Sequence, residues 1–410
     1  MRKHVYILND GCRGSNYGIG TYIRQLTECL KDMEGVVLHV VHLNSDEEQC
    51  KILTKKGYEE LFCPRNNMVW NGKYERYYRH VWYLMRLHTA IERDDVVYFL
   101  LNYVGHRIFI PIMRAQYPDC RIYFTIHYQE WCFALNGNLS KLKEIVGTVD
   151  KENLTSKQKE IFQSFENERE TYRQVDKVIC LAHFTESVLW DLYKIPPENT
   201  TLIYNGLKDE ADLYPLSSRD SLRKQLGFDQ EEKIILFVGR LDPIKGVKLL
   251  IRAFLSLLKE IPNCRLVLVG EGGFSSYLKE CDRHWSKISF TGRLEKERIY
   301  QLYRIADIGV LPSMHEQCSY TAIEMMMFGL PLITSTTTGL EEMNLNPDLK
   351  LYVGDENDEN AEKRLVEIWL DVLGNSWENQ KERQGAARTN YMDKFQIRVF
   401  KKDLEILFEN

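Results

Sequence analysis

Two glutamates, Glu316 and Glu324, lie eight positions apart in the stretch HEQCSYTAIEMMMFGLPLITST, residues 315–336. Strong helix-forming composition in TAIEMMMF, preceded by the helix-starting residues Ser319 and Thr321, predicts a short helix. We therefore expect Glu316 on the loop before this helix and Glu324 on the helix itself. The free amides of a helix N-terminus attract anions, so both carboxylates could reach a ligand lying across that end. The simpler alternative is that these acidic residues only complement the helix dipole.

Two cations, Arg240 and Lys245, form a second feature that could do chemistry, within KIILFVGRLDPIKGVKLLIRAF. The apolar run IILFV predicts a strand that ends at Gly239, and a helix is expected to begin near Gly246. Arg can hold a diphosphate through its planar fork and Lys can hold one as a point charge. Alone, an Arg and a Lys five positions apart on a surface would by default be solvated.

His127 lies at the carboxyl end of the predicted strand in RIYFTIH, where open α/β sheets bind their ligands. A hydrogen-bonded structural histidine is the alternative. Another candidate ligand loop is GCRGSNYGIG, between an apolar strand over 4–10 and a helix expected from about Thr21. Its Gly18 and Gly20 match two glycines of the dinucleotide fingerprint, but the third position is Ile23, which argues against a dehydrogenase.

These residues must be positioned by strands and helices that alternate along the chain. Nearly continuous apolar runs, typical of parallel strands covered on both faces, include VVLHVVHLN, VVYFLLNY, KVICLAH and CRLVLVGEGG. The polar run KDEADLYPLSSRD interrupts the alternation, which predicts two doubly wound α/β domains with a boundary near Leu213. The expected domains are 1–212 and 213–388, followed by a helical segment, 389–410.

Composition narrows the functional class. The chain has 410 residues, 44% hydrophobic and 28% charged, with a net charge of −5, so no global electrostatic case for nucleic acid arises. Ten cysteines without a C-x-x-C pair fit reduced thiols better than zinc or a disulfide scaffold. The N-terminus reads directly into a strand rather than a signal peptide, and no apolar window is long enough to span a membrane. We therefore expect a cytoplasmic protein.

A Glu, seven residues and a second Glu, ending in FGLP and a strand, resembles the donor-sugar signature of retaining GT-B glycosyltransferases of family four (glycosyl transferases group 1). The GR-L-x-x-x-KG pattern around Arg240 and Lys245 and the GIGTY loop also match this family. The resemblance implies two Rossmann-like domains facing a central cleft. It also implies that the helix over 389–410 crosses back to the first domain.

By this resemblance, Arg240 and Lys245 stabilise the leaving nucleoside diphosphate, while Glu316 holds the sugar and Glu324 the ribose. His127 would contact the transferred sugar from the other domain. Donor-binding positions implied by the resemblance are Gly18, Gly20, Gly239, Gly270, Arg293, Leu294, Cys318, Ser319, Tyr320 and Glu324. No D-x-D motif occurs in the sequence, so we expect neither a metal nor another cofactor. Retention of anomeric configuration is implied by the family alone.

The expected donor is a UDP- or GDP-linked sugar, and the acceptor is a glycan, a lipid-linked sugar or a peptide. Tyr320 is bulkier than the small residues the family commonly has after its first Glu. The wording EQCSY and EMMMFGLP resembles a subgroup from Bacteroidetes-type bacteria that lies near peptide-maturation genes, and membership of that subgroup would make a peptide one of the acceptors to consider. A nucleotide-sugar epimerase or hydrolase of the same fold, or a non-catalytic nucleotide-sugar-binding protein, is the alternative function.

Two further segments depart from the repeated pattern. Residues 64–93 mix six arginines and lysines with six tyrosines and tryptophans. Such a segment could contact a membrane surface, which would place the protein at the inner face of the membrane, or a nucleic acid or peptide. An ordinary amphipathic helix with packed aromatics and solvated charges is the favoured interpretation. Residues 136–172 are polar and helix-forming, as in an acceptor-contacting insertion.

Overall fold

The computed structural model describes residues 2–11, 18–65, 74–211, 218–354, 358–374 and 377–409. The chain divides into two compact units, of which the first contains Met1–Glu130, Lys143–Gly206 and Phe400–Asn410. The second contains Trp131–Leu142 and Leu207–Val399. The boundary expected near Leu213 lies outside the described residues.

The first unit is built on an eight-stranded sheet in the order β3-β4-β2-β1-β5-β6-β7-β8. Neighbouring strands are parallel except β3 and β4, which form an antiparallel hairpin. The strands are β1 (Lys3–Asp10), β2 (Val36–Ser45), β3 (Lys51–Lys55), β4 (Tyr58–Pro64), β5 (Val96–Leu101), β6 (Arg121–Ile126), β7 (Lys177–Cys180) and β8 (Thr200–Leu202).

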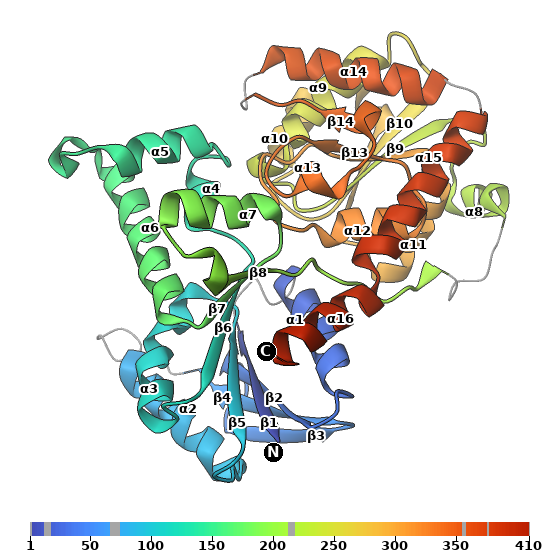
Figure 1. Ribbon diagram of the computed structural model, residues 1–410. Helices are drawn as coiled ribbons and strands as arrows, with labels where there is room; N and C mark the ends of the chain where they lie inside the picture. The colour runs from blue at the N-terminus through green and yellow to red at the C-terminus, as the bar shows by residue number, and fades with distance from the viewer. Residues whose placement is uncertain are drawn as a thin grey trace. The chain divides into compact units, whose positions relative to one another are not determined.

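Helices cover both faces of this sheet (Figure 1). Successive residues of β5 show the two faces, because side chains alternate along a strand. Tyr98 contacts Phe408 of α16, with ring centroids 4.9 Å apart, whereas Phe99 lies 6.1 Å from Trp82 of α2. The helices that begin in this part of the chain, with the C-terminal one, are α1 (Gly18–Leu30), α2 (Tyr74–His88), α3 (Ile110–Gln116), α4 (Glu130–Ala134), α5 (Leu139–Gly147), α6 (Ser156–Gln174), α7 (His183–Val188) and α16 (Ile397–Glu409).

The second unit has a six-stranded parallel sheet in the order β11-β10-β9-β12-β13-β14. Its strands are β9 (Lys233–Val238), β10 (Cys264–Val269), β11 (Ile288–Gly292), β12 (Ile308–Leu311), β13 (Leu332–Ser335) and β14 (Lys350–Leu351). Its helices are α8 (Arg219–Leu226), α9 (Val247–Leu257), α10 (Ser275–Glu280), α11 (Lys296–Ile305), α12 (Tyr320–Met327), α13 (Leu340–Met343), α14 (Glu359–Gly374) and α15 (Trp377–Asn390).

Two Rossmann-like α/β domains with parallel sheets confirm the predicted fold class. Two local predictions need correction. The hairpin β3–β4 was not expected, although the two-residue turn Lys56–Gly57, with Gly57 at a φ of 87°, separates its strands. Helix α1 begins at Gly18 rather than Thr21, so Gly18 and Gly20 lie in its first turn and not in the preceding loop.

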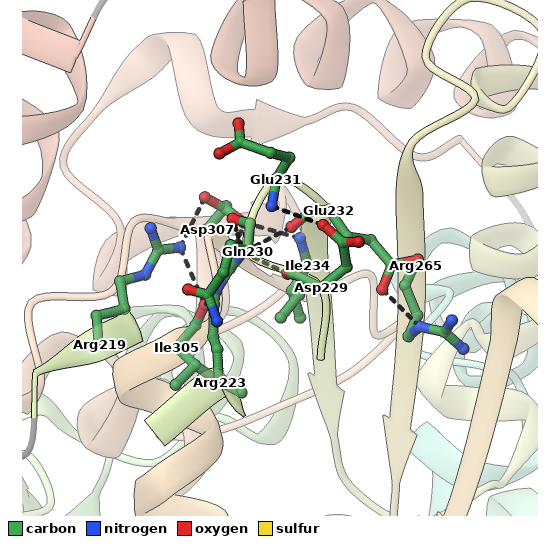
Figure 2. A network of polar contacts seen from close by, with 10 residues as sticks. All are labelled: Arg219, Arg223, Asp229, Gln230, Glu231, Glu232, Ile234, Arg265, Ile305 and Asp307. Atoms are coloured by element: carbon green, nitrogen blue, oxygen red, sulfur yellow. Dashed lines mark hydrogen bonds and ion pairs between the residues drawn. The ribbon is translucent and has the colours of Figure 1, made fainter. Parts of the chain in front are cut away.

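A buried polar network fastens the amino end of the second sheet (Figure 2). Arg223, only 2% exposed, donates to the carbonyl oxygens of Glu232 and Ile305, at 2.8 and 2.9 Å, and to the Asp307 carboxylate at 2.9 Å. The same carboxylate accepts from the backbone amide of Ile234 on β9. Because these partners flank β9 and β12, the network holds together the two strands that carry the site residues at their opposite ends.

Candidate active site

The crevice expected in a doubly wound sheet lies where the strand order reverses. In the second unit the chain starts at β9, proceeds to β10 and β11 on one side, and then returns to β12 and β13 on the other. The loops that follow the carboxyl ends of β9 and β12 therefore lead to opposite sides of the sheet. Arg240 and Lys245 follow β9, and Glu316 follows β12, so the structure brings these three predicted residues to one switch point.

Lys245 and Glu316 form an ion pair across this switch point, with side chains 17% and 19% exposed. Lys245 ends a short 3-10 turn, Pro243–Lys245, directly before α9. Arg240 pairs instead with Asp242, at 3.1 Å. Burial, together with the charge of Lys245, lowers the pKa of the neighbouring His315 to about 3, so this imidazole is neutral. The switch point therefore carries two cations, each balanced by a carboxylate that a bound anion could displace.

A set of hydroxyl groups, which sequence reasoning missed, fixes the loop that carries Glu316. The Thr338 hydroxyl accepts from the Glu316 amide at 2.9 Å and donates to the Glu316 carbonyl at 2.6 Å. The hydroxyls of Ser335 and Thr337 both donate to the Ser313 carbonyl. The signal in the sequence is the run STTT, which begins at the last residue of β13, because a Ser or Thr hydroxyl can both donate and accept.

Glu324 lies on α12, which the Ser319 side chain caps by accepting from the Ala322 amide at 3.4 Å. This confirms the predicted helix and its starting residue, and Gly329 ends the segment with a left-handed φ of 66°. Burial raises the pKa of Glu324 from its ordinary 4.5 to about 7, although the Tyr303 hydroxyl donates to it at 2.9 Å. The carboxyl is thus poised to change charge near neutral pH.

Glycines let the backbone loops of this edge approach closely. Gly270 has a φ of 141°, and a Cβ on it would collide with the Gly239 carbonyl, so the ends of β9 and β10 meet without a side chain between them. Gly246 has a φ of 69°, and a Cβ there would collide with the Pro312 carbonyl. The close contact of Gly246 with Pro312 brings the Lys245 turn against the loop that leads to Glu316.

His127 lies in the first unit, at the carboxyl end of β6 as predicted. Its Nε2 is 3.0 Å from the Asn102 Oδ1, and the Asn102 amide group donates to the Leu8 carbonyl at 3.1 Å. Asn102 therefore presents its oxygen, and His127 must carry its proton on Nε2. Tyr22 packs edge-on against the imidazole, and burial lowers the pKa of His127 to about 3. The result is a neutral imidazole of fixed tautomer, in which Nδ1 is the acceptor; sequence reasoning missed its partner Asn102.

The remaining predicted positions differ in their surroundings. Arg293 is exposed and Leu294 is partly buried, immediately after β11 at the same sheet edge as Lys245. Cys318 is buried and Tyr320 is the first residue of α12. Within the described residues, no group of three or more His, Cys, Asp or Glu side chains is arranged to hold a metal ion. No helix in the described part of the chain is long and apolar enough to cross a membrane.

Comparison with known families finds two matches that follow each other along the chain. The sequence model of "Glycosyltransferase Family 4" matches residues 17–211, and that of "Glycosyl transferases group 1" matches residues 218–390. Each match covers a little under half of the chain, and together they cover most of it. The second match contains every donor-side residue predicted from Gly239 to Glu324.

Individual relatives match part of the chain. An uncharacterized glycosyltransferase of Methanocaldococcus jannaschii is 33% identical over 174 residues, which are 41% of this chain and 44% of that protein. Mannosylfructose-phosphate synthase of Agrobacterium fabrum is 34% identical over 182 residues, 41% of this chain and 39% of that protein. The alignments thus span about half the length of the curated relatives, or less.

Solved structures match over the whole chain. Sucrose-phosphate synthase of Thermosynechococcus elongatus aligns with a TM-score of 0.74 and 18% identity, covering 100% of this chain and 98% of that one. HepE of Anabaena, solved in complex with UDP and glucose, aligns with a TM-score of 0.68 and 16% identity, covering 99% of both chains. The two parts of the chain thus match the two glycosyltransferase family models, and the whole chain shares the GT-B fold of these solved structures.

Proposed function

We propose that the protein transfers a sugar from a nucleoside-diphosphate sugar to an acceptor hydroxyl or other nucleophile, with retention of anomeric configuration. The observation that carries this proposal is the Lys245–Glu316 ion pair at the switch point of the second sheet. A donor diphosphate would compete with Glu316 for Lys245, and the released carboxylate would become available to the sugar. The complex of HepE with UDP and glucose supports the donor class, since that protein shares the fold.

The chemistry requires charge stabilisation on both sides of the breaking bond. When the bond between the anomeric carbon and the phosphate oxygen breaks, its electron pair leaves with the diphosphate, where Arg240 and Lys245 would stabilise the new charge. Removing one such group typically costs 10²–10³ in rate. Glu316 would stabilise the positive charge that develops at the anomeric carbon, and Glu324 would accept hydrogen bonds from the ribose. The neutral His127 would accept one from a sugar hydroxyl through Nδ1.

We also propose that these cations replace a metal, and that no other cofactor takes part. The donor in this proposal is a UDP- or GDP-linked sugar, and the acceptor is a glycan, a lipid-linked sugar or a peptide. Retention follows from the family resemblance noted for the sequence. These finer assignments stand or fall with experiment.

The test is a survey of donor turnover. The purified protein is incubated with UDP- and GDP-linked sugars, with and without candidate acceptors, and the release of nucleoside diphosphate is measured in the presence and absence of EDTA. We expect turnover of one donor class that EDTA leaves intact and that produces an acceptor-linked sugar. Complete loss in EDTA that manganese or magnesium restores would contradict the metal-free assignment, whereas free or epimerised sugar without acceptor dependence would contradict transfer.

A further inference from the structure

Helix α2 lies within the basic and aromatic segment at 64–93. The helix has a buried inner face and an exposed outer face. Its inner face is buried in the first unit, where the Trp82 ring packs against Phe99, Phe109 and Tyr117. This packing confirms the amphipathic-helix interpretation for Tyr77, Tyr78 and Trp82, whereas Trp70 lies outside the described residues. Buried residues of this face are Tyr77, Tyr78, Val81, Trp82 and Met85.

The outer face of α2 is both apolar and cationic. Tyr83 and Leu87, one helical turn apart, are 66% and 76% exposed. The exposed basic side chains around them follow the same stripe of the helix at three- and four-residue spacing. An acidic residue, Glu75, also lies here and pairs with an arginine at 2.7 Å. We define the α2 outer face by Arg76, Arg79, His80, Tyr83, Arg86 and Leu87.

We propose that the α2 outer face binds the surface of an anionic lipid bilayer. A flat negative surface complements a convex helical stripe with arginines on either side of an apolar centre. Long arginine side chains can keep their charge among lipid headgroups while Tyr83 and Leu87 enter the boundary region. The face carries a local positive charge although the whole chain carries a net charge of −5.

Nucleic acid fits this surface less well. Single-stranded nucleic acid is bound by successive exposed aromatic rings on which bases stack. Among the described side chains of α2, the tryptophan and two of the tyrosines are committed to the core, and Tyr83 is the exposed aromatic ring. Amphipathic peptides in turn are bound in apolar grooves rather than on the convex side of a helix. Lipid is therefore the partner that the observed division of side chains favours.

The electrostatic part of this binding sets its expected strength. Each arginine near an anionic membrane contributes roughly a fivefold gain in affinity. Because Arg79 is paired with Glu75, we count Arg76 and Arg86, which together contribute about 25-fold. The attraction falls off within a Debye length, about 8 Å at physiological ionic strength, so the binding must weaken as salt is raised. We expect reversible, salt-sensitive association and no binding to a neutral bilayer.

The test is flotation of the full chain with vesicles, without any sugar donor, so its outcome is independent of the proposed transfer. Vesicles of phosphatidylcholine alone are compared with vesicles that also contain phosphatidylglycerol. The test variant is R76E/R79E/R86E, and the matched control is K143E/K157E/R173E, which makes the same charge change at exposed positions of the first unit. A second variant, Y83A/L87A, keeps every charge and removes the apolar centre.

We expect wild type and the control to float with phosphatidylglycerol and Y83A/L87A to be weakened at every salt concentration. The test variant should lose more than about 25-fold in affinity, because it reverses the charges as well as removing the favourable ones. Circular dichroism checks that all variants are folded, as substitutions at exposed positions should be. The proposal is overturned if wild type does not float, if it floats equally with phosphatidylcholine, or if control and test variant lose binding equally. Binding of wild type to RNA in place of vesicles would also overturn it.

Discussion

Lys245 and Glu316 are arranged so that each neutralises the other while no donor is bound. This pairing costs little because both side chains keep partial contact with solvent, and it keeps the loop after β12 next to the turn before α9. Glu324 has a different environment, in which burial and a tyrosine partner dominate. Replacing one or the other carboxylate of the Glu-x₇-Glu pattern should therefore change different kinetic properties of the enzyme.

Replacing Glu316 should affect the chemical step, and replacing Glu324 should affect donor binding. Glu316→Gln keeps the shape but removes a charge needed only in the transition state, so kcat should fall by about 10²–10³ with a smaller change in KM. Glu324→Ala removes ribose contacts made in ground and transition states alike, so KM should rise with kcat nearly kept. Lys248→Ala, an exposed cation on α9, is the control. Steady-state kinetics with the preferred donor decide, and the reverse pattern contradicts the assignment.

Glu324 also predicts how stability depends on pH. Its pKa is about 7 in the folded chain and near 4.5 when unfolded, so between these values the folded state keeps a proton that the unfolded state has lost. This contribution to stability is present at low pH and is lost as pH rises through about 7. Glu324→Gln should therefore melt at a higher temperature than wild type at pH 8, with a smaller difference at pH 5. Scanning calorimetry measures both; equal pH dependence in the two proteins would show that Glu324 is not the group concerned.

At the scale of elements, β9 and β12 carry the site at one end and the Arg223–Asp307 network at the other (Figure 2). Arg223→Met would leave the Asp307 carboxylate buried with one arginine fewer. Breaking a buried ion pair costs about 3–5 kcal/mol, whereas an exposed pair contributes at most about 1 kcal/mol. We expect a loss of that size in the free energy of unfolding, measured with urea. Arg252→Met, which breaks the exposed pair with Glu280, is the control, and equal losses in both variants would contradict the buried role.

The elements that could be predicted from the sequence are those whose signal is local. Strands buried on both faces show as unbroken apolar runs, and the cap at Ser319 and the left-handed Gly329 mark the ends of α12. The hairpin β3–β4 was missed because its strands are short and half-exposed, so their apolar pattern is weak. The hydrogen bonds between Thr338 and Glu316 were missed because they join residues that are 22 positions apart in the sequence but adjacent in space.

At the scale of the molecule, two segments belong to units that their place in the sequence does not indicate, and for the second of them only the family resemblance implied a return to the first domain. Trp131–Leu142 belongs to the second unit although it lies within the first half of the sequence. Gly137, at a φ of 72°, has no room for a Cβ beside the Met314 carbonyl, which places this segment against the loop before Glu316. Phe400–Asn410 belongs to the first unit, where Phe408 contacts Tyr98 and Tyr123. Such assignments depend on long-range packing, which no local pattern encodes.

The central claim is that a nucleotide-sugar donor binds at the carboxyl edge of the second unit's sheet through Arg240 and Lys245. The direct measurement is thermal unfolding of wild type and Lys245→Ala in the presence of UDP- and GDP-linked sugars. A donor at about 100 times its Kd should stabilise wild type by about 2.7 kcal/mol. The account predicts this stabilisation for one nucleotide class and its loss in Lys245→Ala, whose melting temperature without ligand should stay close to wild type. It is contradicted if no nucleotide sugar stabilises wild type, or if Lys245→Ala is stabilised to the same extent.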